Sequence, residues 1–190
     1  VKPIIGCEVY VAPRRNTDRE YGIDNEAHHL ALLCKDETGY RNLCYLVSCG
    51  FTEGFYIRPR VDKALLREHA EGLIALSACL AGEVPRLLRR GEYENAKAAA
   101  LEMRDIFGPD NYYLELQDHG IDGQRAVNAG LLRLHRETGL PLVLTNDAHY
   151  IAKEDWYNQD VLLCIQTQKT QDDPDRMRFQ TQEFYIKSEE

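Results

Sequence analysis

Short apolar runs alternate with stretches of helical periodicity along the chain. The apolar runs are bounded by glycine, proline or polar residues, which is typical of buried strands. We therefore predict strands over residues 4–13, 28–35, 72–79, 112–117 and 141–146. Between and after them, apolar residues recur with the period of an amphipathic helix. This second pattern predicts helices over residues 36–50, 91–110, 122–139 and 153–168.

The helical periodicity also predicts which side chains face the core. The clearest stripe lies in residues 91–110, and Gly108 and Pro109 end that helix. We expect the following residues to be buried: Tyr93, Ala96, Ala100, Met103 and Phe107; Tyr40, Leu43, Cys44 and Val47; Val127, Leu131, Leu134 and Thr138; Tyr157, Val161, Cys164 and Ile165.

The alternation of strands and helices predicts an α/β fold whose strands are largely parallel. Five strands are too few for a closed barrel, so we expect an incomplete barrel that lacks its first strands. Residues 1–165 are predicted to form one domain. Residues 166–190 lose the periodicity and are predicted to connect this domain to further chain.

Composition narrows the function. The chain has 190 residues, 44% hydrophobic, enough for one substantial core. Its formal net charge of −8 argues against this segment alone holding a phosphate backbone. Apolar runs are too short for a membrane span, so no membrane partner is expected. The six cysteines form no CxxC pair, which fits a reduced, cytoplasmic setting.

An acid and a histidine follow the last predicted strand, in the segment "LVLTNDAHY". Asp147 and His149 are one residue apart, so an extended backbone would point both side chains to one face. Alone, this D-x-H pattern also fits a loop carboxylate beside a solvated histidine. The other strands decide between these interpretations.

Each of the other predicted strands also carries a potential metal ligand. Glu8 interrupts an apolar run, where a buried carboxylate is costly unless paired or ligated; an edge strand with Glu8 in water is the alternative. His28 and His29 lie on opposite faces, and spacing does not choose between them. Together the strand ends supply histidine, carboxylate and thiol groups, a set that suits zinc or a similar transition metal. The further candidates are Cys79, Asp118 and His119.

Several blocks of the sequence resemble the PHP (polymerase and histidinol phosphatase) domain family. They include "KPIIGCEVYVAP", "HHLALLCKDETGYRNLCYLVS", "SACLAGEVPRLL", "ELQDHG" and "TNDAHY". The last two are similar to the branch of the family found in bacterial DNA polymerase III alpha subunits. The resemblance covers essentially the whole chain and implies a distorted barrel of seven βα units with a metal cluster at its strand ends.

The resemblance also implies site residues and function. The implied metal ligands are Glu8, His29, Cys79, Asp147 and His149, holding zinc or manganese; no general base is implied. The family's early H-x-H motif, a further acid and a further histidine precede the first residue here, so we expect a fragment with an incomplete, inactive ligand set. In the longer protein, other domains would synthesise DNA, and this domain would hydrolyse phosphodiesters, as a 3′→5′ proofreading nuclease.

Two alternatives remain open at this point. One is a stand-alone PHP phosphoesterase acting on a small phosphate monoester, as histidinol phosphatase does. The other is a structural module without metal catalysis, which supports the polymerase domains and docks a separate exonuclease subunit. The implied partners are therefore DNA, the remaining polymerase domains and an exonuclease subunit.

Overall fold

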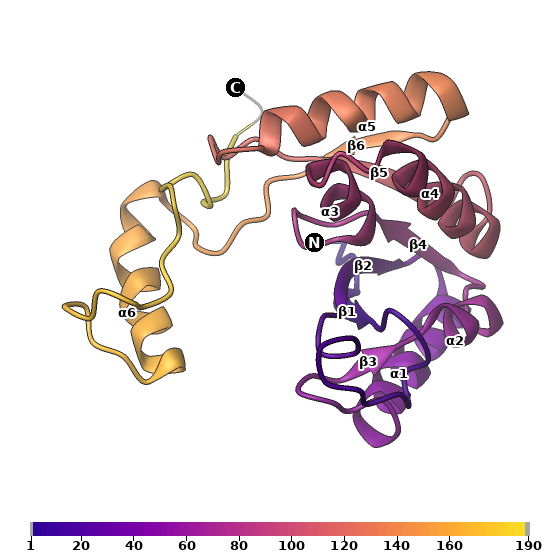
Figure 1. Cartoon of the computed structure of the whole chain (residues 1–190), viewed down its shortest axis with the longest axis horizontal. Helices are drawn as coiled ribbons and strands as arrows, with labels where there is room; N and C mark the ends of the chain where they lie inside the picture. The colour runs from indigo at the N-terminus through magenta and orange to yellow at the C-terminus, as the bar shows by residue number, and fades with distance from the viewer. Residues whose placement is uncertain (1, 189–190) are drawn as a thin grey trace.

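The computed structural model describes residues 2–188, and its centre is one curved six-stranded sheet (Figure 1). The strands lie in the order β3-β1-β2-β4-β5-β6. Their bounds are β1 (Gly6–Val11), β2 (His28–Cys34), β3 (Arg60–Val61), β4 (Leu73–Leu76), β5 (Tyr112–Leu116) and β6 (Leu142–Leu144). Each of the five predicted strands is present, and the two-residue β3 is added at one edge.

The sheet is open and mixed. β1 pairs in parallel with β3, and β5 pairs in parallel with both β4 and β6. β2 runs antiparallel to both of its neighbours, β1 and β4. The chain reaches β2 through a loop over residues 12–27 that contains no helix, whereas a parallel neighbour is usually reached through a crossover helix. The predicted α/β class and unclosed barrel are confirmed, with β2 as the strand that departs from the parallel arrangement.

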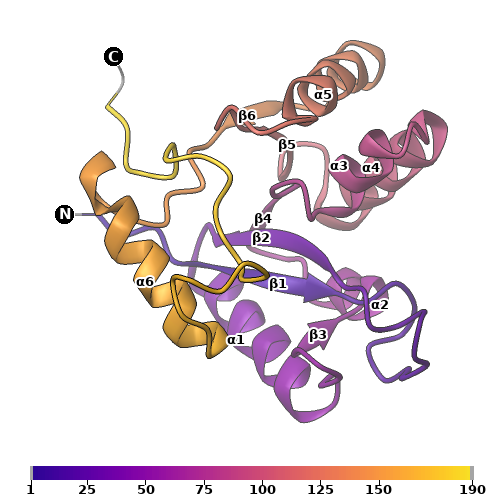
Figure 2. The ribbon, with the colours of Figure 1, turned by 60° about the vertical axis from the view of Figure 1, so that its left-hand side comes forward.

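Five helices, α1 to α5, cover the outside of the sheet, and α6 comes after the last strand in the chain (Figures 1 and 2). Their bounds are α1 (Glu37–Thr52), α2 (Lys63–Glu68), α3 (Glu83–Arg89), α4 (Tyr93–Phe107), α5 (Gln124–Thr138) and α6 (Trp156–Thr167), with a 3₁₀ turn η1 (Lys153–Asp155) before α6. The periodicity did not predict α2 or α3, because helices of six and seven residues are too short to show a clear helical pattern. No helix within residues 2–188 combines the length and apolar character needed to cross a bilayer.

The main hydrophobic core lies between the sheet and helices α1 to α5. Its residues run from Val9 to Leu140. Most of the predicted apolar stripes of α4 and α5 are confirmed, and their first and last residues, Tyr93 and Thr138, are half-buried. The buried residues are Ala96, Ala100, Met103, Phe107, Val127, Leu131 and Leu134. Each fully buried aliphatic side chain of this kind stabilises the fold by about 1.5–3 kcal/mol.

The predicted buried face of α1 is partly wrong. Leu43 is buried as expected, but Tyr40 and Cys44 are exposed. A close backbone approach sets the face instead: a Cβ on Gly39 would lie 1.9 Å from the carbonyl oxygen of Gly72. Because only glycine permits this contact, Gly39 turns towards β4, and Tyr40 and Cys44 turn outward.

Helix α6 stands apart from the sheet (Figures 1 and 2). Its only buried residues are Leu163 and Cys164. The expectation for Cys164 is therefore confirmed, but Tyr157 and Ile165 are 52% and 69% exposed. The local pattern predicted the helix correctly and its burial incorrectly, because no sheet or helix face packs against this stripe within the described residues.

Candidate functional site

The sheet brings three of the predicted metal ligands into contact. Glu8 lies on β1 and His29 on the neighbouring β2, where Glu8 Oε1 and His29 Nδ1 are 3.0 Å apart. Cys79 lies in the turn after β4, with its Sγ 3.7 Å from the same Nδ1. A carboxylate, an imidazole and a thiol from three separate strands therefore converge on one point.

Backbone contacts hold the Cys79 turn against β2. The His29 amide donates to the carbonyl oxygen of Ala81 at 3.2 Å. Gly82 closes the turn so tightly that a Cβ there would lie 2.1 Å from the Ser77 carbonyl oxygen. Ala78, next to Cys79, has a φ of 62°, in the left-handed region that non-glycine residues rarely adopt. Strain of this kind is typical of functional turns.

The charges within this cluster reinforce one another. The hydrogen bond with Cys79, and to a smaller extent the one with Glu8, raises the pKa of His29 to about 9. The hydrogen bond from His29 in turn lowers the pKa of the Glu8 carboxyl group. At neutral pH the protonated His29 ring therefore supplies the positive charge between an acid and a thiol, and a bound metal would take the place of that proton.

Asp147 and His149 lie at the border of this cluster. Asp147 follows β6 and has a φ of 41°, a second strained position in the site. His149 Nδ1 contacts the Asp147 carbonyl oxygen at 2.8 Å. Donation through Nδ1 leaves the Nε2 lone pair available, which is how metal-binding histidines are commonly oriented. The nearby His149 ring also contributes to lowering the pKa of Glu8.

The donor set fits a transition metal chemically, because it combines carboxylate, imidazole and thiol groups. Glu8, His29 and Cys79 are the side chains that would hold the metal first. Among residues 2–188, however, no group of three or more donors is already arranged around one metal position. The five-residue ligand set therefore stays a prediction.

His119 is buried between the ends of β5 and β6. It is 1% exposed, and both of its ring nitrogens have protein partners. Nε2 lies 2.8 Å from the Asn146 carbonyl oxygen, and Nδ1 lies 3.1 Å from the Gln124 side-chain amide. His119 thus joins the ends of β5 and β6.

The segment predicted to be a connector forms one wall of the site. The His149 amide donates to the Phe184 carbonyl oxygen at 2.7 Å, and the Thr181 hydroxyl donates to the His119 carbonyl oxygen at 2.7 Å. The Phe184 ring stacks on His119 with centroids 4.4 Å apart. Sequence reasoning missed this contact. The available signal was the aromatic content of residues 179–185, which is high for a connector.

A cavity of about 350 Å³ opens beside the cluster. Its wall includes the predicted ligands Cys79 and Asp147 and the buried His119. The tail residues Phe179 and Phe184 contribute an aromatic side. A ligand in this cavity would therefore lie against two of the five predicted metal ligands.

Comparison with known proteins agrees with this arrangement. A family model described as the PHP domain matches residues 1–119. Across the whole chain, the DNA polymerase III subunit alpha of Treponema pallidum is 52% identical, and those of Thermus aquaticus and Borreliella burgdorferi are 48% and 45% identical. The chain covers only 16–17% of the length of these three relatives. The matched family model, together with the sheet that brings Glu8, His29 and Cys79 into contact, shows that this chain belongs to the PHP domain family.

Proposed function

We propose that this chain is the PHP part of a bacterial DNA polymerase III alpha subunit and that its site is a metal-dependent phosphodiesterase. The convergence of Glu8, His29 and Cys79 is the observation that carries the second part. The relatives named above support the first part, and their DNA synthesis would reside outside this segment. A cytoplasmic replicative role and DNA as partner follow from the same proposal.

Each predicted ligand would have a distinct task. Glu8, His29 and Cys79 would hold zinc or manganese, and Asp147 and His149 would complete the set from the β6 side. A bound metal would supply an acidified water and neutralise phosphate charge. His119, through Asn146 and Gln124, would keep the β5 and β6 ends at a constant separation.

The reaction proposed is 3′→5′ removal of nucleotides from a DNA strand by the longer protein. The matched pair Cys79→Ala and Cys44→Ala tests it, since Cys44 is an exposed cysteine on α1 away from the site. In the full-length protein, Cys79→Ala should lose bound metal by elemental analysis and lose nuclease activity by at least about a hundredfold. Cys44→Ala should retain both, and DNA synthesis should persist in both variants.

A docking module without metal catalysis is the second candidate. Its support is that Asp147 and His149 only border the contact cluster, so that no complete ligand group is formed within the described residues. Under that function, Cys79→Ala would change neither metal content nor nuclease activity. A stand-alone phosphatase is disfavoured because the relatives above are about six times longer than this chain.

A further inference from the structure

Two arginines border the cavity beside the predicted ligands, and neither has an acidic partner. Arg89 comes from the last turn of α3, and Arg178 comes from the tail. Within residues 2–188, no carboxylate oxygen lies within 4.0 Å of either guanidinium group. A third arginine of the wall, Arg86, is paired with Glu26 at 3.1 Å. In a chain of net charge −8, two unneutralised cations on one cavity favour an anionic ligand.

The preceding part of the tail holds Arg178 in place. Its Nη2 donates to the carbonyl oxygens of Gln171 and Asp173 at 3.3 and 3.2 Å. Two residues earlier, Arg176 forms a bidentate pair with Asp160 of α6, with N–O distances of 2.5 and 2.7 Å. This pair is largely buried, so the tail carries Arg178 to the cavity on an anchored backbone.

Another part of the cavity wall is aromatic rather than charged, which narrows the chemical class of the ligand further. Phe179 and Phe184 stack with centroids 4.5 Å apart, and both line the cavity. An aromatic surface beside two cations suits a ligand with a flat ring and a phosphate. The volume of about 350 Å³ is at the small end of ligand sites, which have about 300–1,000 Å³. That space is of the order that a single nucleotide requires.

We propose that this cavity binds the single unpaired terminal nucleotide of a DNA strand. Arg89 and Arg178 would hold its phosphate, because guanidinium groups match phosphate oxygens in geometry and charge. Phe179 would contact its base. This inference rests on the proposed phosphodiesterase function and specifies its substrate: a frayed strand end, with the scissile phosphate beside Cys79 and Asp147.

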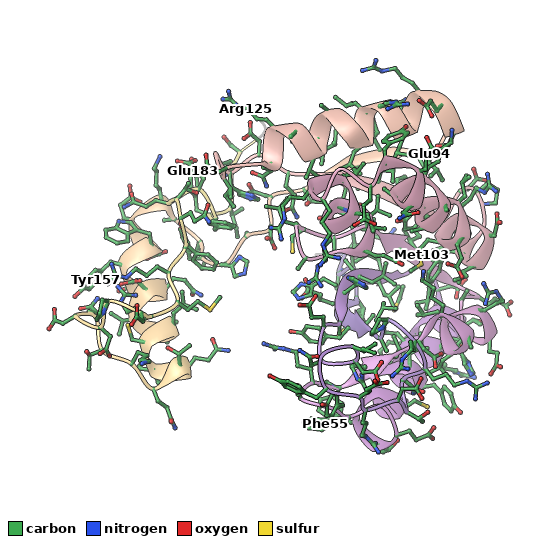
Figure 3. The ribbon with its side chains drawn as sticks, in the orientation of Figure 1. Phe55, Glu94, Met103, Arg125, Tyr157 and Glu183 are labelled. Carbon is green, nitrogen blue, oxygen red and sulfur yellow. The ribbon has the colours of Figure 1, made fainter. Side chains whose placement is uncertain are left out.

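The binding step can be measured without any metal. The purified full-length protein is titrated with deoxyadenosine 5′-monophosphate in EDTA at low salt, by calorimetry. Arg89→Gln and Arg178→Gln should each weaken binding about tenfold, the loss expected for a charge-assisted hydrogen bond. Arg125→Gln is the matched control, because Arg125 is exposed at the start of α5, outside the cavity (Figure 3); its affinity should equal that of the unmodified chain.

A second pair of titrations separates the nucleotide from its phosphate. Phe179→Leu should weaken binding of the nucleotide and leave binding of inorganic phosphate unchanged. Circular dichroism of every variant verifies that the fold is retained. The proposal is overturned if the nucleotide does not bind, if the two arginine variants bind it as the control does, or if inorganic phosphate binds equally tightly.

The experiments test the metal-dependent nuclease and the terminal-nucleotide site independently of each other. Because EDTA removes metal, an arginine-dependent affinity for the nucleotide would stand even if the full-length protein showed no nuclease activity. Conversely, a metal-dependent nuclease whose activity on single-stranded ends is unaffected by Arg89→Gln and Arg178→Gln would retain the proposed function and contradict the terminal-nucleotide site.

Discussion

The sheet body and the C-terminal segment of this chain are held together by different forces. The body buries a continuous apolar cluster from Val9 to Leu140. In residues 145–188, the only buried hydrophobic residues are Leu163, Cys164 and Phe184. The segment is stabilised internally by ion pairs, such as Arg176 with Asp160, and it contacts the body through the hydrogen bonds of its tail at the site.

The difference shows what amphipathic periodicity establishes. Helices α5 and α6 both follow an apolar pattern, but α5 packs on the sheet whereas Leu162 and Ile165 of α6 are 57% and 69% exposed. Tyr157 likewise projects from α6 on the side away from the sheet (Figure 3). A helix can form from local pattern, but its burial requires a complementary face elsewhere.

The largest effect expected is in the core of the body. Leu134 is 0% exposed, so Leu134→Ala should lower the free energy of unfolding by about 3 kcal/mol through lost burial and a cavity. Leu162→Ala on α6 is the matched control, and it should change that free energy by no more than about 0.5 kcal/mol. Urea denaturation measures both. Equal losses would show that α6 is packed as tightly as α5.

A smaller, local effect is expected at the tail. Phe184 is 4% exposed and packs on His119 and Phe179, so Phe184→Ala should weaken tail attachment by about 2 kcal/mol. Limited trypsin digestion should then cleave faster after Arg176 and Arg178.

The control for this variant is Phe55→Ala, which removes an aromatic ring that is 50% exposed and belongs to the body (Figure 3). It should leave the rate of tail cleavage unchanged. If both variants were cleaved at the rate of the unmodified chain, the contact between Phe184 and the site would have no stabilising role.

The smallest effect expected depends on pH. The hydrogen bond from Arg176 holds the pKa of Asp160 below its usual value. A lowered folded-state pKa contributes stability above the unfolded pKa of about 3.9, and that stability is lost as pH falls through the folded value. Acidification below about pH 4 should therefore loosen the tail from α6.

Trp156, the single tryptophan, lines a second cavity together with Asp160 and Arg176. Its fluorescence therefore reports the loosening of the tail. Asp160→Asn should shift the emission at pH 7 and remove the acid transition below about pH 4. Asp122→Asn, at an exposed position before α5, should retain the transition. An acid transition that persists in Asp160→Asn would assign it to other carboxyl groups.

Local sequence determined the elements and the chemistry available at their ends. The five predicted strands and four predicted helices are present, and the stripes of α4 and α5 are buried as their periodicity indicates. The donor residues at strand ends could be identified for the same reason: a polar side chain inside or after an apolar run is visible in the sequence alone. The resemblance to the PHP family added the choice of His29 over His28.

Contacts between distant segments decided the rest. Arg60 is 1% exposed and donates to the carbonyl oxygens of Gly54, Asp24, Asn16 and Asp18, which fixes the loop before β2. The antiparallel direction of β2, the outward face of α1 and the return of the tail to the site also depend on such partners. Periodicity describes one element at a time, whereas these features arise from the pairing of elements far apart in the chain. Tertiary structure alone therefore brought Glu8, His29 and Cys79 together.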